Sequence, residues 1–131
     1  MHIRRDDVPV KIDAPGAVAR QLPDFGDATG YGTIGGEFFS LAAGTDIAPL
    51  LAGLEGDSCQ APHWGYMLSG VLVVSYRDGT DEQCEGGELF YWPPGHTVRV
   101  TEDADVILFS PAVEHTAALD HMLDQMAGAG S

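Results

Sequence analysis

The sequence predicts an all-β fold, a barrel or sandwich of short strands, with one helix at its C-terminal end. Its 17 glycines and 8 prolines fall in short clusters that indicate turns. The apolar runs between these clusters have the length and the nearly regular spacing of strands in such folds. From residue 113 to 126, apolar residues recur instead with a helical period. We expect one domain over residues 1–131, because a chain that is 44% apolar and 20% charged suits one hydrophobic core.

The first 36 residues are expected to form an arm and a loop ahead of the barrel core. Short strands are predicted at 8–12 and 17–22. Residues 25–36 are rich in glycine and are predicted to form a loop. This loop does not match a phosphate-binding loop, since it lacks the lysine and the strand-to-helix context of that motif.

The barrel core is expected over residues 37–110, beginning with a strand at 37–42. The apolar stretch 47–54 contains Pro49 and is interpreted as a strand or an edge segment. Residues 77–80, Arg-Asp-Gly-Thr, predict a hairpin turn, because Asp-Gly supplies the positive φ angles of tight hairpins. Further strands are predicted at 66–68, 71–76, 81–84, 88–92, 97–101 and 104–110, with turns at 93–95 and at 102–103.

The formal net charge of −14 argues against nucleic acid and anionic membranes as partners. Binding to either requires clustered lysine and arginine side chains. The chain has 20 acidic residues against 6 basic ones, and a solvated acidic surface accounts for the excess. Four of the basic residues lie within the first twenty positions and two follow later: Arg4, Arg5, Lys11, Arg20, Arg77 and Arg99.

The sequence shows neither a membrane-spanning stretch nor an export signal. No apolar run approaches the roughly 20 residues that span a bilayer. The residues at 1–7 lack the apolar core of a signal peptide. We therefore expect a cytoplasmic protein, in which Cys59 and Cys84 stay reduced rather than forming a disulfide.

Two stretches resemble the conserved motifs of the cupin family. Residues 66–72, Tyr-Met-Leu-Ser-Gly-Val-Leu, resemble the end of the first motif, and residues 87–96 resemble the second, a glycine, a strand and a Pro-x-Gly turn. The chain is similar to small single-domain bacterial cupins, in a subgroup with Cys-Gln-Ala-Pro-His-Trp-Gly-Tyr at 59–66 and Pro-Pro-Gly-His at 93–96. The resemblance implies a double-stranded β-helix, the cupin jelly-roll barrel, which is usually a homodimer with a pocket inside the barrel.

The chain departs from the cupin pattern at the positions of the usual metal ligands. Asp57 and Cys59 stand where the first motif commonly presents two histidines, and His63 stands where the acidic ligand would be. In the second motif the position of the metal-binding histidine is occupied by Val98, and a histidine occurs earlier, at His96. The usual set of three histidines and one carboxylate is therefore absent from these positions.

The replacing residues suggest an unusual site for a divalent metal, zinc or iron. Cys59, His63 and His96 offer a thiolate and two imidazoles, which are good ligands for these ions, and Asp57 or Glu55 is a further candidate. On a strand, Glu55, Asp57 and Cys59 would share one face. Two alternatives stay open. Cys59 and the histidines can be ordinary buried residues, or they can catalyse without metal, with a histidine as base or Cys59 as nucleophile.

Aromatic residues near both motifs predict a pocket for a small-molecule ligand. Phe90 and Trp92 alternate and can share one face of a strand. The function expected is that of a small-molecule enzyme or metal-binding protein of unassigned reaction. The alternatives are a non-catalytic ligand-binding or sensing module and a purely structural dimerisation module. His2, His115 and His121 are expected at the surface or near the termini. The residues expected to line the pocket are Cys59, His63, Tyr66, Phe90, Trp92 and His96.

Overall fold

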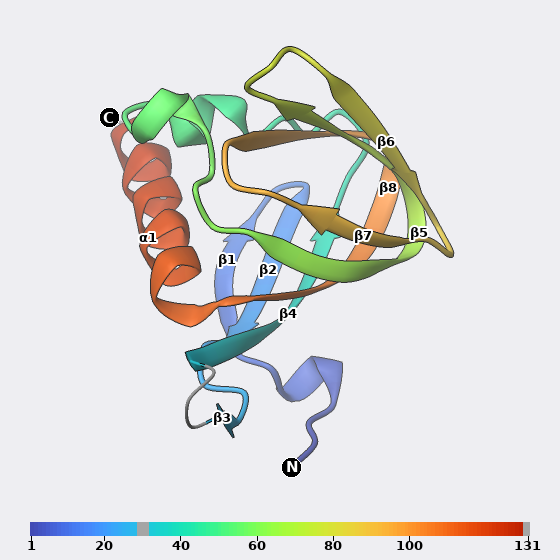
Figure 1. Cartoon of the computed structure of the whole chain (residues 1–131), viewed down its shortest axis with the longest axis vertical. Helices are drawn as coiled ribbons and strands as arrows, with labels where there is room; N and C mark the ends of the chain where they lie inside the picture. The colour runs from blue at the N-terminus through green and yellow to red at the C-terminus, as the bar shows by residue number, and fades with distance from the viewer. Residues whose placement is uncertain (29–31, 130–131) are drawn as a thin grey trace.

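The computed structural model describes residues 1–28 and 32–129, which form a curled antiparallel sheet with one long helix beside it (Figure 1). The elements are β1 (Val10–Ala14), β2 (Ala17–Leu22), β3 (Asp27–Ala28), β4 (Gly32–Leu41), β5 (His63–Tyr76), β6 (Asp81–Glu85), β7 (Leu89–Trp92), β8 (His96–Pro111) and α1 (Ala112–Ala129). The strand order in the described part of the sheet is β1-β2-β4-β8-β5-β6, with β3 paired to β4 and β7 paired to β5. This arrangement is a jelly roll.

The long strands β5 and β8 pair with each other and form the spine of the barrel. Their pairing runs from Trp64 opposite Phe109 to Tyr76 opposite His96, with register shifts near its middle. Such irregularities bend the strands and let the sheet curl on itself. The hairpin expected at 77–80 joins β5 to β6, with Gly79 at a φ of 87°.

The turn predicted at 102–103 is wrong, because β8 continues through these residues as a bulged strand. Gly70 on β5 explains why the bulge fits there. A Cβ at this position would lie 2.0 Å from the carbonyl oxygen of Asp103, and Gly70 also has a φ of 85°. Only a residue without a side chain permits this close backbone approach.

The N-terminal arm belongs to the sheet rather than lying ahead of it. β1 pairs with β2, and β2 pairs with β4 over six residues. The loop predicted at 25–36 is wrong at Asp27–Ala28, which form β3, and from Gly32 onward, where β4 begins; residues 29–31 lie outside the described part. Gly36 is a strand residue covered by Phe25, whose ring lies 3.1 Å from where a Cβ of Gly36 would be. Glycine here indicates close packing rather than a turn.

The strand or edge segment expected at 47–54 is also wrong, since Ala48–Leu51 forms a short 3-10 helix. Asp46 Oδ1 accepts a hydrogen bond from the backbone N–H of Ala48 at 2.9 Å, which favours a turn at this point. Pro49 fits the first turn of a helix, where its missing N–H has no partner to lose. Leu51 is fully buried against the helix side of the sheet.

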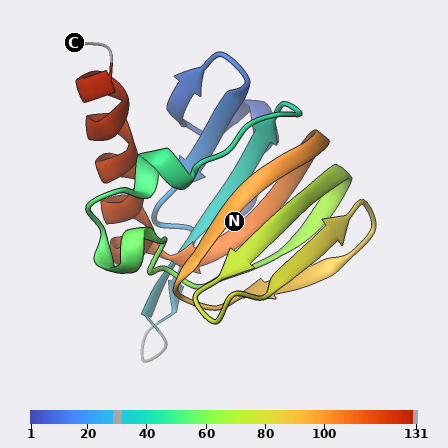
Figure 2. The ribbon, with the colours of Figure 1, turned by 90° about the horizontal axis from the view of Figure 1, so that it is seen from above.

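The helix α1 covers one side of the barrel, and the helix expected at 113–126 is confirmed within it. Leu119 and Met122 pack on Ile12 and Ala19 of the first two strands. Figure 2 shows the 3-10 segment lying between α1 and the barrel. Within residues 1–28 and 32–129, no helix has the length and apolar character that a membrane crossing requires.

Candidate functional site

The side chains of Cys59, His63 and His96 come together between the barrel and α1. They are 4%, 3% and 1% exposed, and one potential ligand atom from each lies within 4.8 Å of the others. The backbone fixes this meeting, because the N–H of Cys59 donates to the carbonyl of His96 at 2.9 Å. The two cupin-like motifs, which are separate in sequence, thus touch directly at this point.

The ring of His63 is held by a chain of hydrogen bonds through Ser110 to Glu37. Ser110 Oγ donates to Glu37 Oε1 at 2.6 Å, so the same hydroxyl accepts from the Nδ1–H of His63, also at 2.6 Å. This assigns the proton of the neutral ring to Nδ1. The lone pair on Nε2 then faces Cys59, whose Sγ lies 3.6 Å away.

The ring of His96 is oriented in the same sense by a different partner. Its Nδ1 lies 2.7 Å from the carbonyl oxygen of Pro93, which can only accept a hydrogen bond. Nδ1 therefore carries the proton, and Nε2 again keeps its lone pair. The rings of His96 and His63 are 5.0 Å apart between centroids. Both imidazoles are thus set up to bind through Nε2.

Burial keeps this cluster uncharged in the absence of a bound ion. It lowers the pKa of His63 well below the ordinary value, and the neighbouring His115 and His96 add to the effect. It also lowers the pKa of His96, against the hydrogen bond to Pro93. Burial raises the pKa of the Cys59 thiol to about 11. A free thiol in this state is a poor nucleophile, so Cys59 needs a cation to become a thiolate.

Glu37 and His115 form a second buried group that sequence reasoning missed. His115 was expected at the surface, and this expectation is wrong, since the residue is 3% exposed and its Nδ1 bonds to Glu37 Oε2. The reason is that α1 starts directly after β8 and folds its first turn onto β4. Glu37, His63 and His115 also offer potential ligand atoms within 4.8 Å of one another. The signal in the sequence was a lone glutamate in an apolar strand.

Asp57 lies away from the cluster, at a position that does not fit the expected ligand role. Residues Glu55–Asp57 form a short 3-10 segment rather than a strand. Gly56 and Asp57 have positive φ angles of 64° and 52°, so the backbone here is not extended. Asp57 is exposed, and its Oδ1 accepts from the N–H of Gly53 at 3.0 Å. Glu55 instead faces Arg77 at 3.8 Å on the surface.

The three aromatic residues expected in the pocket have different positions. Trp92 lines the cavity, edge-on to the ring of His63 at 6.0 Å. Phe90 stacks on Trp92 within the barrel core and is not among the described residues that line the cavity. Tyr66 is 38% exposed and lies on the outer face, opposite Leu89. Its side chain points away from the cavity.

The cavity has a volume of about 340 Å³, and the cluster forms its closed end. His115 lines it as well, next to His63 and His96. The exposed lining residues mark the mouth and include Asp46 and Pro49. The closed end formed by the cluster is called the floor of the cavity. The walls between mouth and floor are almost entirely apolar and come from the strands and from the helices, for example Ile12, Phe39, Leu51, Leu119, Met122 and Met126.

Comparison with known proteins shows the fold. Neither a family model nor a curated protein matches the chain. The polyketide cyclase RemF from Streptomyces resistomycificus aligns with a TM-score of 0.59 and 20% identity, over 86% of this chain and 79% of that one. A conserved protein of unknown function from Streptococcus pyogenes, SPY1581, aligns with a TM-score of 0.53 and 20% identity, over 72% and 73%.

Oxalate decarboxylase of Bacillus subtilis, in a structure that describes Mn(II) centres, aligns with a TM-score of 0.58 and 18% identity. The alignment covers 84% of this chain and 29% of the decarboxylase, so the chain spans less than a third of that enzyme's length. These neighbours have the cupin fold, and the predicted jelly roll with a C-terminal helix is confirmed. Identities of this size carry no further information about the reaction.

Proposed function

We propose that this protein is a metal-dependent enzyme acting on a small molecule, with the metal held by Cys59, His63 and His96. The observation that carries the proposal is the orientation of the two histidines. Each uses its Nδ1–H on a fixed acceptor and keeps its Nε2 lone pair, that of His63 facing Cys59 Sγ at 3.6 Å. One potential ligand atom of His96 lies within 4.8 Å of one from each of these two residues. Histidines bound to metals in proteins have this arrangement, in which an outer partner sets the tautomer.

The donor set fits zinc or iron. A thiolate and two imidazoles are softer ligands than the oxygens preferred by magnesium or calcium. The Mn(II) centres named for oxalate decarboxylase belong to that protein, and the cysteine here favours a softer ion. Three protein ligands leave a coordination position for water or substrate, which is typical of catalytic zinc sites.

The surrounding residues have distinct tasks in this proposal. Ser110 and Glu37 hold the ring of His63, and the carbonyl of Pro93 holds that of His96. The buried carboxyl group of Glu37 is itself held by Ser110 and His115. When bound, a divalent ion polarises a substrate oxygen or lowers the pKa of a bound water. The apolar walls hold the substrate and keep out bulk water.

A non-catalytic binding or sensing module for a small apolar molecule is the second candidate function. The observation that favours it is the apolar character of the cavity walls together with an uncharged floor. A purely structural dimerisation module would have a filled barrel, and a cavity of about 340 Å³ argues against it. The two candidates differ in whether a metal is held tightly.

A cobalt titration tests the proposed ligand set. Metal-free protein is titrated with Co²⁺, and we expect a thiolate-to-cobalt charge-transfer band that saturates at one ion per chain. The band should disappear in Cys59→Ala and weaken strongly in His96→Ala. Cys84→Ala is the matched control, since Cys84 is also a buried free thiol but lies in the barrel core. A band that survives Cys59→Ala would refute the proposed ligand set.

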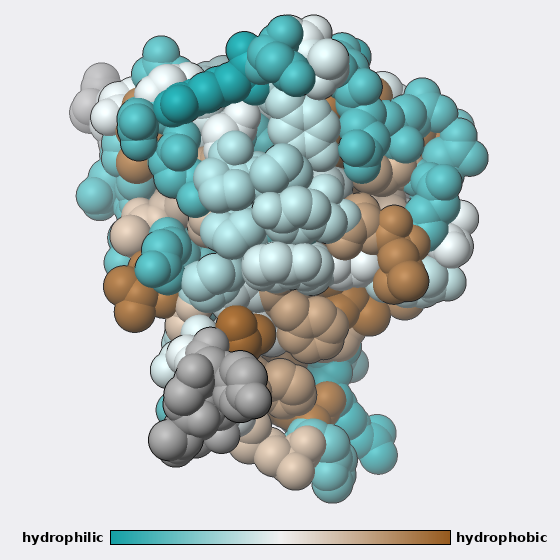
Figure 3. Space-filling model, viewed as in Figure 1, coloured by the Kyte–Doolittle hydropathy of each residue, from teal (hydrophilic) through white to brown (hydrophobic). Residues whose placement is uncertain are grey.

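The homodimer expected from the family resemblance is part of the proposal. Outward residues of β5, β7 and β8 form apolar rows, in which Trp64 lies between Tyr91 and Phe109, and Tyr66 between Leu89 and Ile107. Figure 3 shows aromatic rings side by side on this face. These rows contain no charged residue, so two chains of the same high negative charge can meet there without placing like charges in direct contact. A second copy of the chain is the proposed occupant. The exposed residues of this face are Trp64, Tyr66, Leu68, Leu89, Tyr91 and Phe109.

A further inference from the structure

We infer that the cavity takes a neutral, largely apolar molecule with one hydroxyl-like polar end, and that it discriminates against a carboxylate of the same size. The inference deepens the proposed function and depends on it only for the metal at the floor. It follows from three features of the cavity, namely its walls, the charges around its mouth and the hydrogen-bonding capacity of its floor.

The apolar walls of the cavity indicate that most of the ligand is apolar. Between the mouth and the floor, the cavity passes between β1 and β2 on one side and α1 on the other, lined by side chains such as Ile12, Leu119 and Met126. These offer no hydrogen bond, so a polar group in the middle of the ligand would lose its hydration without compensation. A volume of about 340 Å³ lies in the range of small-molecule pockets.

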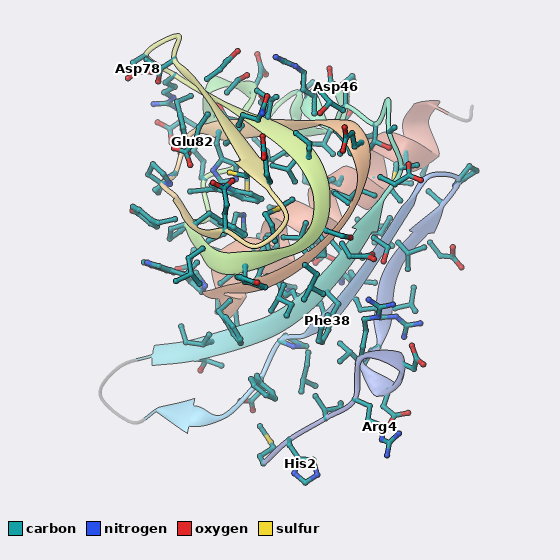
Figure 4. The ribbon with its side chains drawn as sticks, turned by 90° about the vertical axis from the view of Figure 1, so that its right-hand side faces the viewer. His2, Arg4, Phe38, Asp46, Asp78 and Glu82 are labelled. Carbon is teal, nitrogen blue, oxygen red and sulfur yellow. The ribbon has the colours of Figure 1, made fainter. Side chains whose placement is uncertain are left out.

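The charges around the cavity disfavour an anion. Among the described residues that line it, none is lysine or arginine, and Asp46 stands exposed at the mouth. The basic residues on β1, β2 and β8 have other partners: Lys11 pairs with Asp120, Arg99 pairs with Asp81, and Arg20 donates to backbone carbonyl oxygens of the N-terminal segment. Figure 4 shows Asp46 at one end of the molecule and Arg4 at the opposite end. A carboxylate would pass an acidic mouth and then lie among apolar walls without a counter-ion.

The hydrogen-bonding groups at the floor indicate which polar group the ligand carries at its end. His63 and His96 both present the lone pair of Nε2, because their Nδ1–H groups are used elsewhere. Two acceptors favour a group that donates a hydrogen bond, such as a hydroxyl, and oppose a carboxylate, which only accepts. With a divalent ion held by Cys59, His63 and His96, a hydroxyl oxygen would bind the ion in the open coordination position. A neutral hydroxyl oxygen therefore suits the floor both in the metal-free protein and with a divalent ion bound.

Three matched probes test the inference: 2-naphthol, naphthalene and 2-naphthoate. Each is titrated by calorimetry into the full chain, once as purified and once after removal of metal by a chelator. In the metal-free protein we expect 2-naphthol to bind about tenfold or more tightly than 2-naphthoate, and more tightly than naphthalene, because the anion leaves its charge unpaired. As-purified protein should keep the preference for 2-naphthol over naphthalene.

Cavity variants show where the probes bind. Ala17 lines the cavity and is half-buried, so Ala17→Phe should abolish binding of 2-naphthol by filling the space. Ala14→Leu, at a second lining position, serves if the first variant does not fold. Val113→Ser is the matched control, because Val113 is exposed on α1, does not line the cavity and lies outside the proposed dimer face. It should bind 2-naphthol as the unmodified chain does.

The outcomes separate this inference from the proposed function. Equal or tighter binding of 2-naphthoate to metal-free protein overturns the inference, and so does a lack of binding by all three probes. If Co²⁺ binds as proposed while 2-naphthoate is preferred, the metal site stands and the ligand class is wrong. If 2-naphthol is preferred but no metal binds, the ligand class stands and the enzyme proposal is wrong.

Discussion

The hydroxyl of Ser110 lies 2.6 Å from Nδ1 of His63, although the two residues are 47 positions apart in the chain. Both are buried, and the hydroxyl donates its own hydrogen bond to Oε1 of Glu37. The ring of His63 is therefore fixed in position and in tautomer by groups that do not face the cavity directly. This relationship supports the interpretation of the cluster as a metal site, and it leads to the first test.

Replacing Ser110 with alanine should weaken metal binding without removing a ligand. The substitution deletes the acceptor of the His63 Nδ1–H, and losses of such outer partners reduce metal affinity by about 10- to 100-fold. Competition with a chromophoric zinc chelator measures the change. Ser40→Ala is the matched control, because Ser40 also donates to a carboxylate, that of Asp105, but lies outside the cluster. An unchanged affinity in Ser110→Ala would show that the serine has no part in the site.

The stability of the metal-free protein should fall as the pH is lowered below about 6.5. Because the pKa of His63 is lowered in the folded protein, the unfolded chain binds more protons in this range. The contribution of His63 is complete above 6.5 and is lost as the pH falls through the folded pKa, by at most about 1.4 kcal/mol per pH unit. Urea unfolding between pH 5 and pH 8, roughly the interval in which histidines titrate, measures the slope.

The variant His63→Gln should flatten this pH dependence. His2→Gln provides the comparison, since His2 is exposed at the N-terminal end. If the slope is the same in the unmodified chain and in His63→Gln, burial of this histidine does not govern the acid sensitivity.

Cys59 should react slowly with thiol reagents in the folded, metal-free protein. Burial raises the pKa of its thiol to about 11, and it also raises that of Cys84, so the thiolate fraction is small near neutral pH. With a disulfide reagent at mildly alkaline pH, both cysteines are expected to react fully only after denaturation. Rapid labelling of Cys59 in the native protein, identified by peptide mapping, would instead favour a nucleophilic role.

Substituting Gly70 tests the bulge that bends β8. Gly70→Ala should destabilise the fold by more than about 2 kcal/mol, because its Cβ would overlap the carbonyl of Asp103 in addition to the positive φ. Gly79→Ala is the matched control, since its φ is 87° but a Cβ there meets nothing within 4 Å. It should cost only about 1 kcal/mol. Similar losses in both variants, measured by urea unfolding, would contradict the close approach.

A charged side chain on the outer aromatic face should dissociate the proposed homodimer. Trp64→Glu places a carboxylate in the middle of the apolar row between Tyr91 and Phe109. Light scattering coupled to size exclusion should then give the mass of one chain, against two for the unmodified protein. Val113→Glu is a control, because Val113 is exposed on α1 and lies outside this face. A monomeric unmodified chain would refute the dimer directly.

The features that depend on neighbours in the chain could be predicted from the sequence. The Asp-Gly hairpin, the strand at 17–22 and the helical period after residue 112 all have local causes, and the structure confirms them. The prediction of a strand or edge segment at 47–54 was wrong because an apolar run does not distinguish a strand from a short helix. The ligand role expected for Asp57 failed for a related reason. Alternate residues share a face only where the backbone is extended, and residues 55–57 are not extended.

The partners of the cluster could not be predicted, because they come from distant parts of the chain. His115 and Glu37 are 78 positions apart, and only the folding of α1 onto β4 brings them together. Neither residue lies in a cupin-like motif, so the resemblance gave no indication of them. Cys59, His63 and His96 do lie in those motifs, which made them candidates, and the structure brings them together.

The metal content of the protein as purified shows whether Cys59, His63 and His96 hold a metal ion. The chain should be produced without an affinity tag and without added metal, and analysed for zinc, iron and manganese by mass spectrometry. We expect about one ion of zinc or iron per chain, a loss of most of it in His63→Ala, and full retention in Cys84→Ala. Metal well below one ion per chain, with no change in His63→Ala, would contradict it.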